Sequence, residues 1–297
     1  MSKSGLHVVI PVLNRWHQTR ACLRRLLDQG QPPAGIVVVD HGSVDETAEG
    51  LATEFPGVVH LESDPEHWWT GASNAGIRTA MDRGASRIML LNNDCLLGQG
   101  SLHRLLEHAE QNPDAVIAPV QRNTSGKVQV VTARTLFLLG FQTLIPPGSR
   151  RKAGNGKLLP TGMIVGGRGA IIPRTVFDRV GLFDEARLPH YGADHDFYLR
   201  CRKQGVPLRI AADAFVDIDE TITTLAWGPG SLSLAQFLET LRRRRSHRNL
   251  RDLSTLFRLH YPIPGLWWVG VGLNLLRYTA VYVTARVARV FAPAGRK

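Results

Sequence analysis

The alternation of apolar runs with helix-like segments over residues 6–120 restricts the fold of this chain more than any other feature. Five short apolar runs have the length of buried strands. They cover residues 6–12, 35–40, 57–61, 87–92 and 115–120. Helical patterns lie between them, at about 16–28, 45–54, 73–83 and 101–111. This rhythm predicts an α/β fold with a doubly wound, mostly parallel sheet and helices on both faces.

Three of these runs end in polar residues. Asn14 and Arg15 follow the first run, residues 40–43 end the second, and residues 92–94 end the fourth. Ligands of open α/β sheets bind outside the carboxyl ends of the strands. One acid at a strand end is more often a turn or cap residue. Three polar ends in one sheet favour a binding crevice at that edge.

The second of these strand ends, in VVVDHGSVDET, contains a tight turn. Gly42 relieves the backbone there, and Ser43 or Asp45 can cap the next helix. Asp40 has no evident capping role, so its carboxylate is a candidate to accept hydrogen bonds from a nucleobase or ribose. The chain has no GxGxxG or GxxxxGK[ST] motif that would hold phosphates. Mg²⁺ or Mn²⁺ bound by Asp94 is the candidate that would neutralise them.

The net charge of +11 resides in the C-terminal part of the chain. From Thr240 to Lys297 there are 12 basic residues and one acid, and the preceding residues hold 24 of each sign. A nucleic-acid binder would carry a basic stripe on its folded domain. This distribution therefore argues against nucleic acid as a partner and favours one specific anionic partner for the tail.

The tail, residues 226–297, begins with amphipathic helical patterns that include Arg242 to Arg245. An apolar segment with two tryptophans follows at 263–291, interrupted by Asn274 and three arginines. Its uninterrupted apolar stretch is shorter than the ~20 residues that a spanning helix needs. Tryptophan and arginine beside apolar residues favour a helix that lies on an anionic membrane surface. Packing on the body, a homodimer contact and a true span are the alternatives.

The cysteines and the N-terminus predict a cytoplasmic protein. Cys22, Cys95 and Cys201 are widely spaced, without a CxxC pair or a neighbouring histidine cluster. A reducing compartment is therefore expected. The first residues lack the long apolar core and the cleavage site of a signal peptide. With the tail, this predicts a peripheral position on the inner face of the cell membrane.

Six motifs occur along residues 6 to 210 in an order that is typical of one enzyme family. They are VVIPVLNR, VVVDHGSVDET, WWTGASNAGI, LLNNDC, GGRGAIIPRTVFDRVGLFDE and YGADHDFYLRCRKQG. The chain resembles the family-2 glycosyltransferases of the glycosyltransferase-A (GT-A) fold, especially bacterial rhamnosyltransferase-like members. The resemblance implies a catalytic domain over 1–225, with a nucleotide-sugar half at about 1–125 and an acceptor half at 126–225. The tail, 226–297, lies outside it.

The resemblance also implies roles for the donor-side residues. Asp40 would hold the nucleotide base, and Asp94 would bind the metal on the donor diphosphate. Asn92 stands where the family's first metal-motif acid stands, which is a departure that removes one charge. The other residues implied at the donor site are Pro11, Asn14, Gly42, Ser43, Trp69, Asn74 and Asn93.

The segment HWWTGASNAGI has two adjacent tryptophans. Core packing is the commoner fate of tryptophan. We expect one of Trp68 and Trp69 in the core, and we place Trp69 against the donor sugar. Asn74 is expected near the start of the following helix, with its amide pointing into the cleft.

The segment YGADHDFYLRCRKQG predicts a helix that begins near Asp194 and ends at Gly205. An acid in a first turn is often only a helix cap. The family places its catalytic base, the second acid of a Glu-Asp pair, at Asp194. Ala193 replaces the first acid, a second departure, and Asp196 is the rival for the role.

The implied activity is an inverting, metal-dependent glycosyl transfer from a nucleoside diphosphate sugar to a hydroxyl of a glycan or lipid-linked acceptor in cell-surface polysaccharide synthesis. dTDP-rhamnose is the favoured donor by resemblance, ahead of UDP- and GDP-sugars. A binding relic without turnover is an alternative, which Asn92 and Ala193 encourage. A sugar nucleotidyltransferase is another, although it would carry an early glycine-rich basic loop. A glycosidase would release sugar without consuming a nucleotide donor.

Overall fold

The computed structural model describes residues 5–219, 232–244 and 246–290 of the 297-residue chain. The predicted boundary between residues 225 and 226 and the predicted role of Arg245 lie outside the described residues. So does the C-terminal end of the predicted tail, 291–297.

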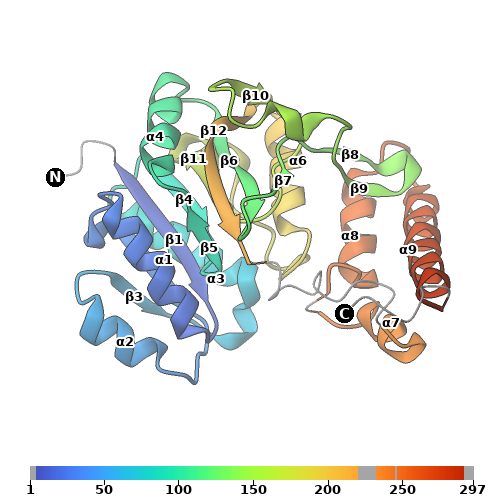
Figure 1. Cartoon of the computed structure of the whole chain (residues 1–297), viewed down its shortest axis with the longest axis horizontal. Helices are drawn as coiled ribbons and strands as arrows, with labels where there is room; N and C mark the ends of the chain where they lie inside the picture. Colours follow the sequence, from blue (N-terminus) through green and yellow to red (C-terminus); the bar gives the residue numbers. More distant parts are fainter. Residues whose placement is uncertain (1–4, 220–231, 245, 291–297) are drawn as a thin grey trace.

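A ten-stranded mixed sheet forms the body of the molecule (Figure 1). Its strand order is β10-β12-β6-β11-β4-β1-β2-β3, with β5 on β12 and β7 on β6. The strands are β1 (Leu6–Val12), β2 (Ile36–Asp40), β3 (Val59–Glu62), β4 (Arg87–Leu91), β5 (Cys95–Leu97), β6 (Val116–Asn123), β7 (Val128–Val130), β10 (Leu158–Pro160), β11 (Arg168–Pro173) and β12 (Leu208–Ile218). A separate hairpin consists of β8 (Arg134–Leu136) and β9 (Phe141–Leu144).

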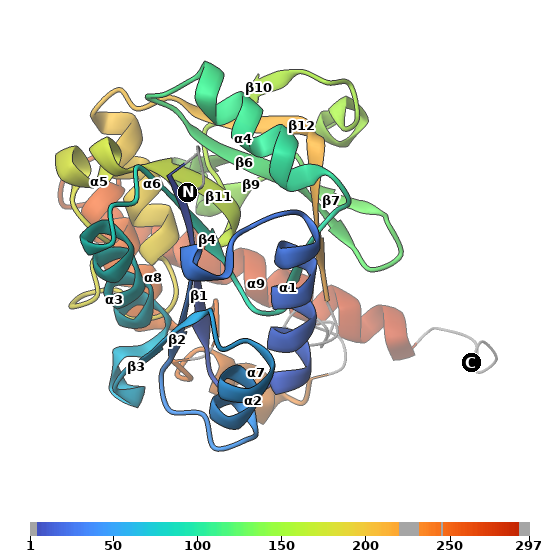
Figure 2. The same ribbon diagram turned by 90° about the vertical axis from the view of Figure 1, so that its left-hand side faces the viewer.

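The helices cover both faces of this sheet. They are α1 (Trp16–Asp28), α2 (Thr47–Glu54), α3 (Trp68–Asp82), α4 (Ser101–Gln111), α5 (Arg174–Val180), α6 (Ala193–Lys203), α7 (Leu234–Thr240), α8 (Leu250–His260) and α9 (Trp267–Val290). The described ranges also contain the short 3₁₀ turns η1 (Pro33–Gly35), η2 (Pro65–His67), η3 (Phe137–Leu139) and η4 (Ser149–Lys152). Figure 2 shows α3, α5 and α6 on one side of the sheet and α1 on the other.

Alternation along the strands explains the two layers. Successive side chains of a strand point to opposite faces, so Val8 and Ile10 join the core under α1, whereas Val9 joins the core under α3. Strands β4, β1, β2 and β3 are parallel, while β11 runs antiparallel to β4. In the register of β1 and β2, Val12 lies opposite Asp40, so both carboxyl ends reach one edge of the sheet.

The strands and helices of residues 6–120 lie close to their predicted bounds, with one clear exception. The predicted start of the third helix, residue 73, is wrong, because α3 begins at Trp68. The 3₁₀ turn η2 precedes it directly, and Asp64 caps that turn by accepting the Glu66 N–H (2.8 Å). Both indoles therefore belong to the first turn of a helix, and Asn74 lies in its second turn rather than at its start.

The tail helices form a layer beyond α6. Helix α8 packs on α6, and α9 packs on α8 and on η3 of the hairpin. Figure 1 shows α8, α9 and the β8–β9 hairpin together, at the opposite end of the molecule from α1 and α2. Among the described helices, none is both long enough and apolar enough to cross a membrane.

Candidate active site

The polar strand ends meet at one edge of the sheet, as the topology predicts. The Asn14 N–H donates to Ser43 Oγ (2.6 Å), and the Asn14 Oδ1 accepts the Val44 N–H (2.8 Å). Both Asn14 and Arg15 have left-handed backbones, with φ of 59° and 66°. The left-handed region is unusual for residues other than glycine, so these contacts hold the β1–α1 turn in a fixed shape. Pro11 is buried beside it in β1.

Asp40 ends β2 with a carboxylate that is 6% exposed. Its Oδ1 accepts the Ser43 N–H (2.8 Å) across the turn that Gly42 forms with φ of 101°. Its Oδ2 lies 3.9 Å from His60 Nε2, which is too far for a hydrogen bond. The hydrogen bond to Oδ1 therefore fixes the side chain, and Oδ2 is able to accept a hydrogen bond from a nucleobase or ribose.

Asn92 and the loop before β11 form the corner of the site. The Asn92 N–H donates to the Gly167 carbonyl (2.8 Å), and its Oδ1 accepts the Trp69 indole N–H (3.0 Å). A Cβ on Gly167 would lie 2.7 Å from the Trp69 ring and 3.1 Å from the Asn92 Oδ1. Glycine is therefore required for this close approach of backbone to indole. Trp69 also packs edge-on against Phe183 (5.7 Å between centroids).

Asp94 lies between β4 and β5, two residues after Asn92, with a side chain that is 14% exposed. Its Oδ2 is 4.0 Å from the Arg15 guanidinium, and its Oδ1 is 3.5 Å from the Cys95 thiol. Burial and, after it, the charge of Asp94 raise the pKa of Cys22 to about 12. Burial and the same carboxylate also raise the pKa of Cys95. Neither thiol is a nucleophile at neutral pH.

The residues around Asp94 fit a metal that is shared with a substrate. The described part of the chain contains no group of three or more His, Cys, Asp or Glu side chains that could hold a metal ion. Mg²⁺ is commonly bound by one or two carboxylates, with substrate phosphates and water completing its shell. Asp94 supplies such a carboxylate, while the Asn92 Oδ1 is already engaged by Trp69. The donor set fits an ion that binds together with a diphosphate.

Asp194 reaches the same corner from the other half of the chain. Its Oδ2 accepts the Gly166 N–H (2.8 Å), and its Oδ1 lies 3.0 Å from His195 Nδ1. The other ring nitrogen of His195 is 2.7 Å from the Thr143 hydroxyl in β9. The N-cap of α6, Gly192, has no side-chain cap hydrogen bond. The carboxylate of Asp194 therefore binds a neighbouring loop and a histidine rather than the backbone at the start of its own helix.

The partners of Asp194 also decide its charge. Burial raises the pKa of this carboxyl, but the charge and hydrogen bond of His195 and the Gly166 N–H outweigh burial and hold the pKa at about 2. Burial lowers the pKa of His195, but the charge and hydrogen bond of Asp194 raise it more, so the pKa lies above 6.5. Asp194 is therefore ionised throughout the physiological pH range.

Asp196, the rival of Asp194, faces the other way. Its Oδ2 accepts the Arg200 Nε–H (2.8 Å), and its Oδ1 is 2.8 Å from His260 Nε2 at the end of α8. The residue is 2% exposed. Asp194 also has a partner on each oxygen, but its side chain is 16% exposed, whereas that of Asp196 is 3% exposed and lies between Arg200 and His260. Asp196 therefore ties α6 to α8 and is not open to a substrate.

Two residues predicted at the donor site have their side-chain amides engaged by the protein. Asn74 is 1% exposed, donates to the Phe183 carbonyl (2.9 Å) and Glu185 Oε2 (3.1 Å), and accepts the Phe183 N–H (3.1 Å). Asn93 donates to the Thr19 hydroxyl (3.1 Å). The structure therefore does not bring these two amide groups to the corner that Asn92 and Asp94 share.

Three groups without a predicted role form a hydrogen-bonded set around Asp194 and His195. They are the Gly166 N–H, the His195 imidazole and the Thr143 hydroxyl. His195 adjoins Asp194 in the chain, which was the only available signal. Thr143 lies 52 residues away, and nothing in its own segment marks it.

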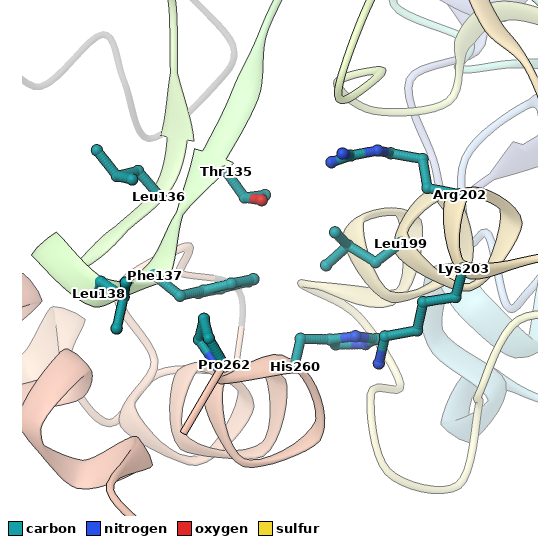
Figure 3. Close-up of a pocket in the computed structure, with 9 residues that line it drawn as sticks. All are labelled: Thr135, Leu136, Phe137, Leu138, Leu199, Arg202, Lys203, His260 and Pro262. Carbon is teal, nitrogen blue, oxygen red and sulfur yellow. The ribbon is translucent and has the colours of Figure 1, made fainter. Parts of the chain in front are cut away.

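A separate cavity of about 350 Å³ lies between the hairpin, the C-terminal end of α6 and the end of α8 (Figure 3). Arg202 and Lys203 line one side, and Leu136 and Phe137 line the other. None of the predicted donor or base residues is among its lining residues. It is therefore distinct from the corner described above.

Comparison with known proteins identifies a family. Residues 7–181 match the family described as Glycosyl transferase family 2. Uncharacterized proteins of Mycobacterium bovis and Mycobacterium tuberculosis are 24% identical over 229 residues, which cover 72% of this chain and 73% of theirs.

Two solved structures share the fold. The crystal structure of GalNAc-T7 with UDP, GalNAc and Mn²⁺ is 13% identical, with a TM-score of 0.58, and the match covers 98% of this chain. This chain spans 58% of the length of that one. The mannosyltransferase PcManGT from Pyrobaculum calidifontis, in complex with GDP-Man and Mn²⁺, is 15% identical with a TM-score of 0.55 and coverages of 98% and 76%. The mixed α/β fold predicted from the sequence is confirmed, and it is of the GT-A type.

Proposed function

The chain belongs to glycosyl transferase family 2, and on that premise we propose that it transfers a sugar, with inversion, from a nucleoside diphosphate sugar to a hydroxyl of a glycan or lipid-linked acceptor. One observation carries this proposal. The Asn92 N–H donates to the Gly167 carbonyl, and the adjacent Gly166 N–H donates to Asp194, both at 2.8 Å. The segment that bears Asp94 and the carboxylate of Asp194 are thus bonded to the same pair of glycines.

The donor side consists of Asp40 and Asp94. The free Oδ2 of Asp40 would accept an N–H of the base or an O–H of the ribose, while its Oδ1 stays bonded to Ser43. Asp94 would hold Mg²⁺ or Mn²⁺ against the donor diphosphate. When bound, such an ion supplies positive charge that stabilises the departing diphosphate. Both structures that share the fold contain Mn²⁺ with a nucleotide or nucleotide sugar, which supports this role.

Asp194 would act as the general base. The acceptor hydroxyl loses its proton to the carboxylate while its oxygen bonds to the anomeric carbon, and the bond from that carbon to the diphosphate breaks. Because the pKa of Asp194 is about 2, the carboxylate is ionised at neutral pH. The Gly166 N–H and His195 fix its orientation from two sides. A positioned base of this kind contributes about 10²- to 10⁴-fold to the rate.

The donor nucleotide is tested by thermal shift. The full chain is heated with dTDP, UDP, GDP or CDP, each with Mn²⁺, Mg²⁺ or a chelator, beside an Asp94→Ala variant. A ligand at about 100 times its Kd stabilises a protein by about 2.7 kcal/mol, which is readily measured. We expect one nucleotide to give a metal-dependent shift that Asp94→Ala abolishes, with dTDP favoured because of the resemblance to rhamnosyltransferases.

Two results would reject parts of this assignment. A shift that survives in Asp94→Ala and in chelator would remove the metal from the proposal. A nucleotide shift without sugar transfer to any tested acceptor would favour a binding relic, the alternative that Asn92 and Ala193 encourage.

The tail fits a peripheral position on the inner face of the cell membrane. The outer side of α9 and the loop before it expose apolar side chains, including Trp268 (60%) and Leu276 (68%). Helix α9 contains arginines and no acidic residue. Apolar side chains next to basic ones favour binding to an anionic membrane surface. A homodimer contact over the same face remains the second candidate.

Vesicle sedimentation tests the membrane contact. We expect the full chain to pellet with phosphatidylglycerol vesicles and less with phosphatidylcholine vesicles. Leu276→Glu should weaken pelleting, because it places a charge on the apolar face. Ala52→Glu adds the same charge at an exposed site on α2, at the other end of the molecule, and should change nothing. Equal pelleting of both variants would reject α9 as the contact.

A further inference from the structure

Two arginines on the inner side of the tail have no acidic partner among the described residues. Arg248 precedes α8 and is 8% exposed, and its Nε has no hydrogen-bond partner. The Nε of Arg277, in α9, is likewise buried and without a partner. Within the described ranges neither guanidinium forms an ion pair, whereas the nearby Arg244 lies 3.7 Å from Asp252. Burying a charge costs free energy unless the charge is paired. An anion bound to these two cations would offset that cost.

The contacts that the two arginines do make are aromatic. The Arg248 Cζ lies 5.6 Å from the centre of the Tyr278 ring. The Arg277 Cζ lies 4.5 Å from the Phe141 ring and 4.8 Å from the Tyr278 ring. Ring contacts of this kind stabilise the flat face of a guanidinium. The Tyr278 hydroxyl also forms a hydrogen bond with Arg277, but none of these aromatic partners carries a negative charge.

The histidine beside the pair provides no counter-charge. His247 lies next to Arg248, and its ring is 6.0 Å from that of Tyr278. Burial and the charges of Arg248 and Arg277 lower the pKa of His247 to about 4. The histidine is therefore neutral at physiological pH and adds no negative charge. Burial also lowers the pKa of Arg248, which is the expected sign for a cation without a counter-ion.

This cluster lies on the acceptor side of Asp194. The His247 ring is 6.5 Å from that of Tyr191, three residues before Asp194. The Tyr278 hydroxyl accepts a hydrogen bond from Gln142 (3.4 Å), whose neighbour in β9, Thr143, contacts His195. The donor-side residues come instead from the ends of β1, β2 and β4. Figure 1 shows α8, α9 and the β8–β9 hairpin on the side of α6 that faces away from those strands.

The geometry points to a phosphate subsite for the acceptor, formed by Arg248 and Arg277. Arginine is well suited to phosphate because its N–H groups form a planar fork that bonds two oxygens at once. In helix α9, Arg277 lies over the Phe141 ring of the hairpin, and Leu276 is 68% exposed. A ligand with a phosphate bound by the two arginines and a hydrocarbon chain along the exposed apolar side of α9 would match both features. The acceptor is therefore a lipid phosphate or lipid diphosphate.

The identification of this ligand as the acceptor rests on the proposed function. The binding site itself can be tested without sugar transfer. Geranyl diphosphate and inorganic pyrophosphate serve as probes for the full chain, with affinity measured by calorimetry. A chelator is present throughout, so that metal-dependent binding of diphosphate at Asp94 does not contribute. The variants are Arg248→Met and Arg277→Met, which keep the length of the side chain and remove its charge.

We expect wild type to bind geranyl diphosphate more tightly than pyrophosphate, and each variant to bind at least about 30-fold more weakly, since one partner of a buried charge pair is lost. Arg251→Met removes an exposed arginine of α8 and should leave the affinity unchanged. Without ligand, Arg248→Met should be as stable as wild type or more stable, because a buried cation without a partner has been removed.

The affinities and the unfolding temperatures test the phosphate site, its lipid specificity and the proposed function separately. Equal affinity for the two probes, lost in both variants, keeps the phosphate site but rejects the lipid. Unchanged affinity in both variants overturns the site, and so does a lower unfolding temperature of unligated Arg248→Met, because a stabilising arginine has then been removed. Lipid diphosphate binding that depends on both arginines, in a protein that transfers no sugar, would contradict the proposed function and leave this site standing.

Discussion

Two faces of α6 carry an aspartate each, and the two environments differ in almost every respect. Asp194 faces the loop at Gly166 and the hairpin, and its side chain is 16% exposed. Asp196 faces α8, and its side chain is 3% exposed. The partners of Asp194 are a backbone N–H and a histidine, whereas those of Asp196 are Arg200 and His260.

The difference shows how one residue type serves two purposes within one helical turn. Arg200 and His260 occupy both oxygens of Asp196, so removing that carboxylate would leave a guanidinium and an imidazole without their partner. The side chain of Asp194 lies beside Gly166 and is 16% exposed. Position in the sequence does not distinguish the roles of the two aspartates, because both lie in the first turn of α6. Their hydrogen-bond partners distinguish them.

The largest expected effect separates the two aspartates by activity. Asp194→Asn should reduce the rate of sugar transfer by about 10²- to 10⁴-fold, because the amide cannot accept the proton of the acceptor hydroxyl. Nucleotide binding in the thermal-shift assay should be unchanged, since Asp194 does not contact the nucleotide in this account. Steady-state rates with the donor identified there provide the measurement. If Asp194→Asn kept more than about a tenth of the rate, Asp194 would not be the base.

The next effect separates them by stability. Asp196→Ala should lower the free energy of unfolding by about 3 kcal/mol, because a buried ion pair is broken from one side. Asp178→Ala is the matched control, since its pair with Arg174 is at 3.9 Å and its side chain is 58% exposed. That change should cost less than about 1 kcal/mol. Urea unfolding of both variants makes the comparison, and equal losses would contradict the structural role of Asp196.

The smallest effect concerns acid stability. The pKa of Asp194 is about 2 in the folded protein, below its ordinary value of 3.8. A lowered pKa means that the ionised group favours the folded state, so its contribution is present above about pH 4 and is lost as the pH falls towards 2. The shift corresponds to about 2 kcal/mol.

Urea unfolding of wild type and Asp194→Asn between pH 6 and about pH 2 measures this contribution. The difference in unfolding free energy between the two proteins should shrink as the pH falls. A difference that stays constant over this range would show that Asp194 is not held in its ionised form by His195 and Gly166.

Much of the donor half follows from its sequence. Periodicity located β1, β2, β4 and α1 within a residue or two, because these elements are buried by a regular pattern. Convergence of their polar ends followed from the parallel order of the strands. The start of α3 did not follow, since the turn at Pro65 leads straight into the helix and no separate cap precedes the two tryptophans.

The acceptor side was less predictable, and the reason is physical. Asp194 was located by its motif, but the Gly166 N–H that it binds is 28 residues away, and Thr143, which contacts the neighbouring His195, is 52 residues from that histidine. Such contacts depend on how the hairpin packs against α6 and α9, and no local pattern encodes that packing. Asn74 illustrates the same limit from the donor side, because its amide binds residues 183–185.

The central claim is that one base on α6 drives a direct displacement at the donor sugar, and the stereochemistry of the product tests it most directly. The anomeric configuration of the transferred sugar is determined by NMR from the one-bond coupling between carbon and hydrogen at C1, in donor and in product. We expect opposite configurations, because the acceptor oxygen attacks the face away from the diphosphate. Retention of configuration would contradict this claim and would require a covalent intermediate or a different arrangement of donor and acceptor.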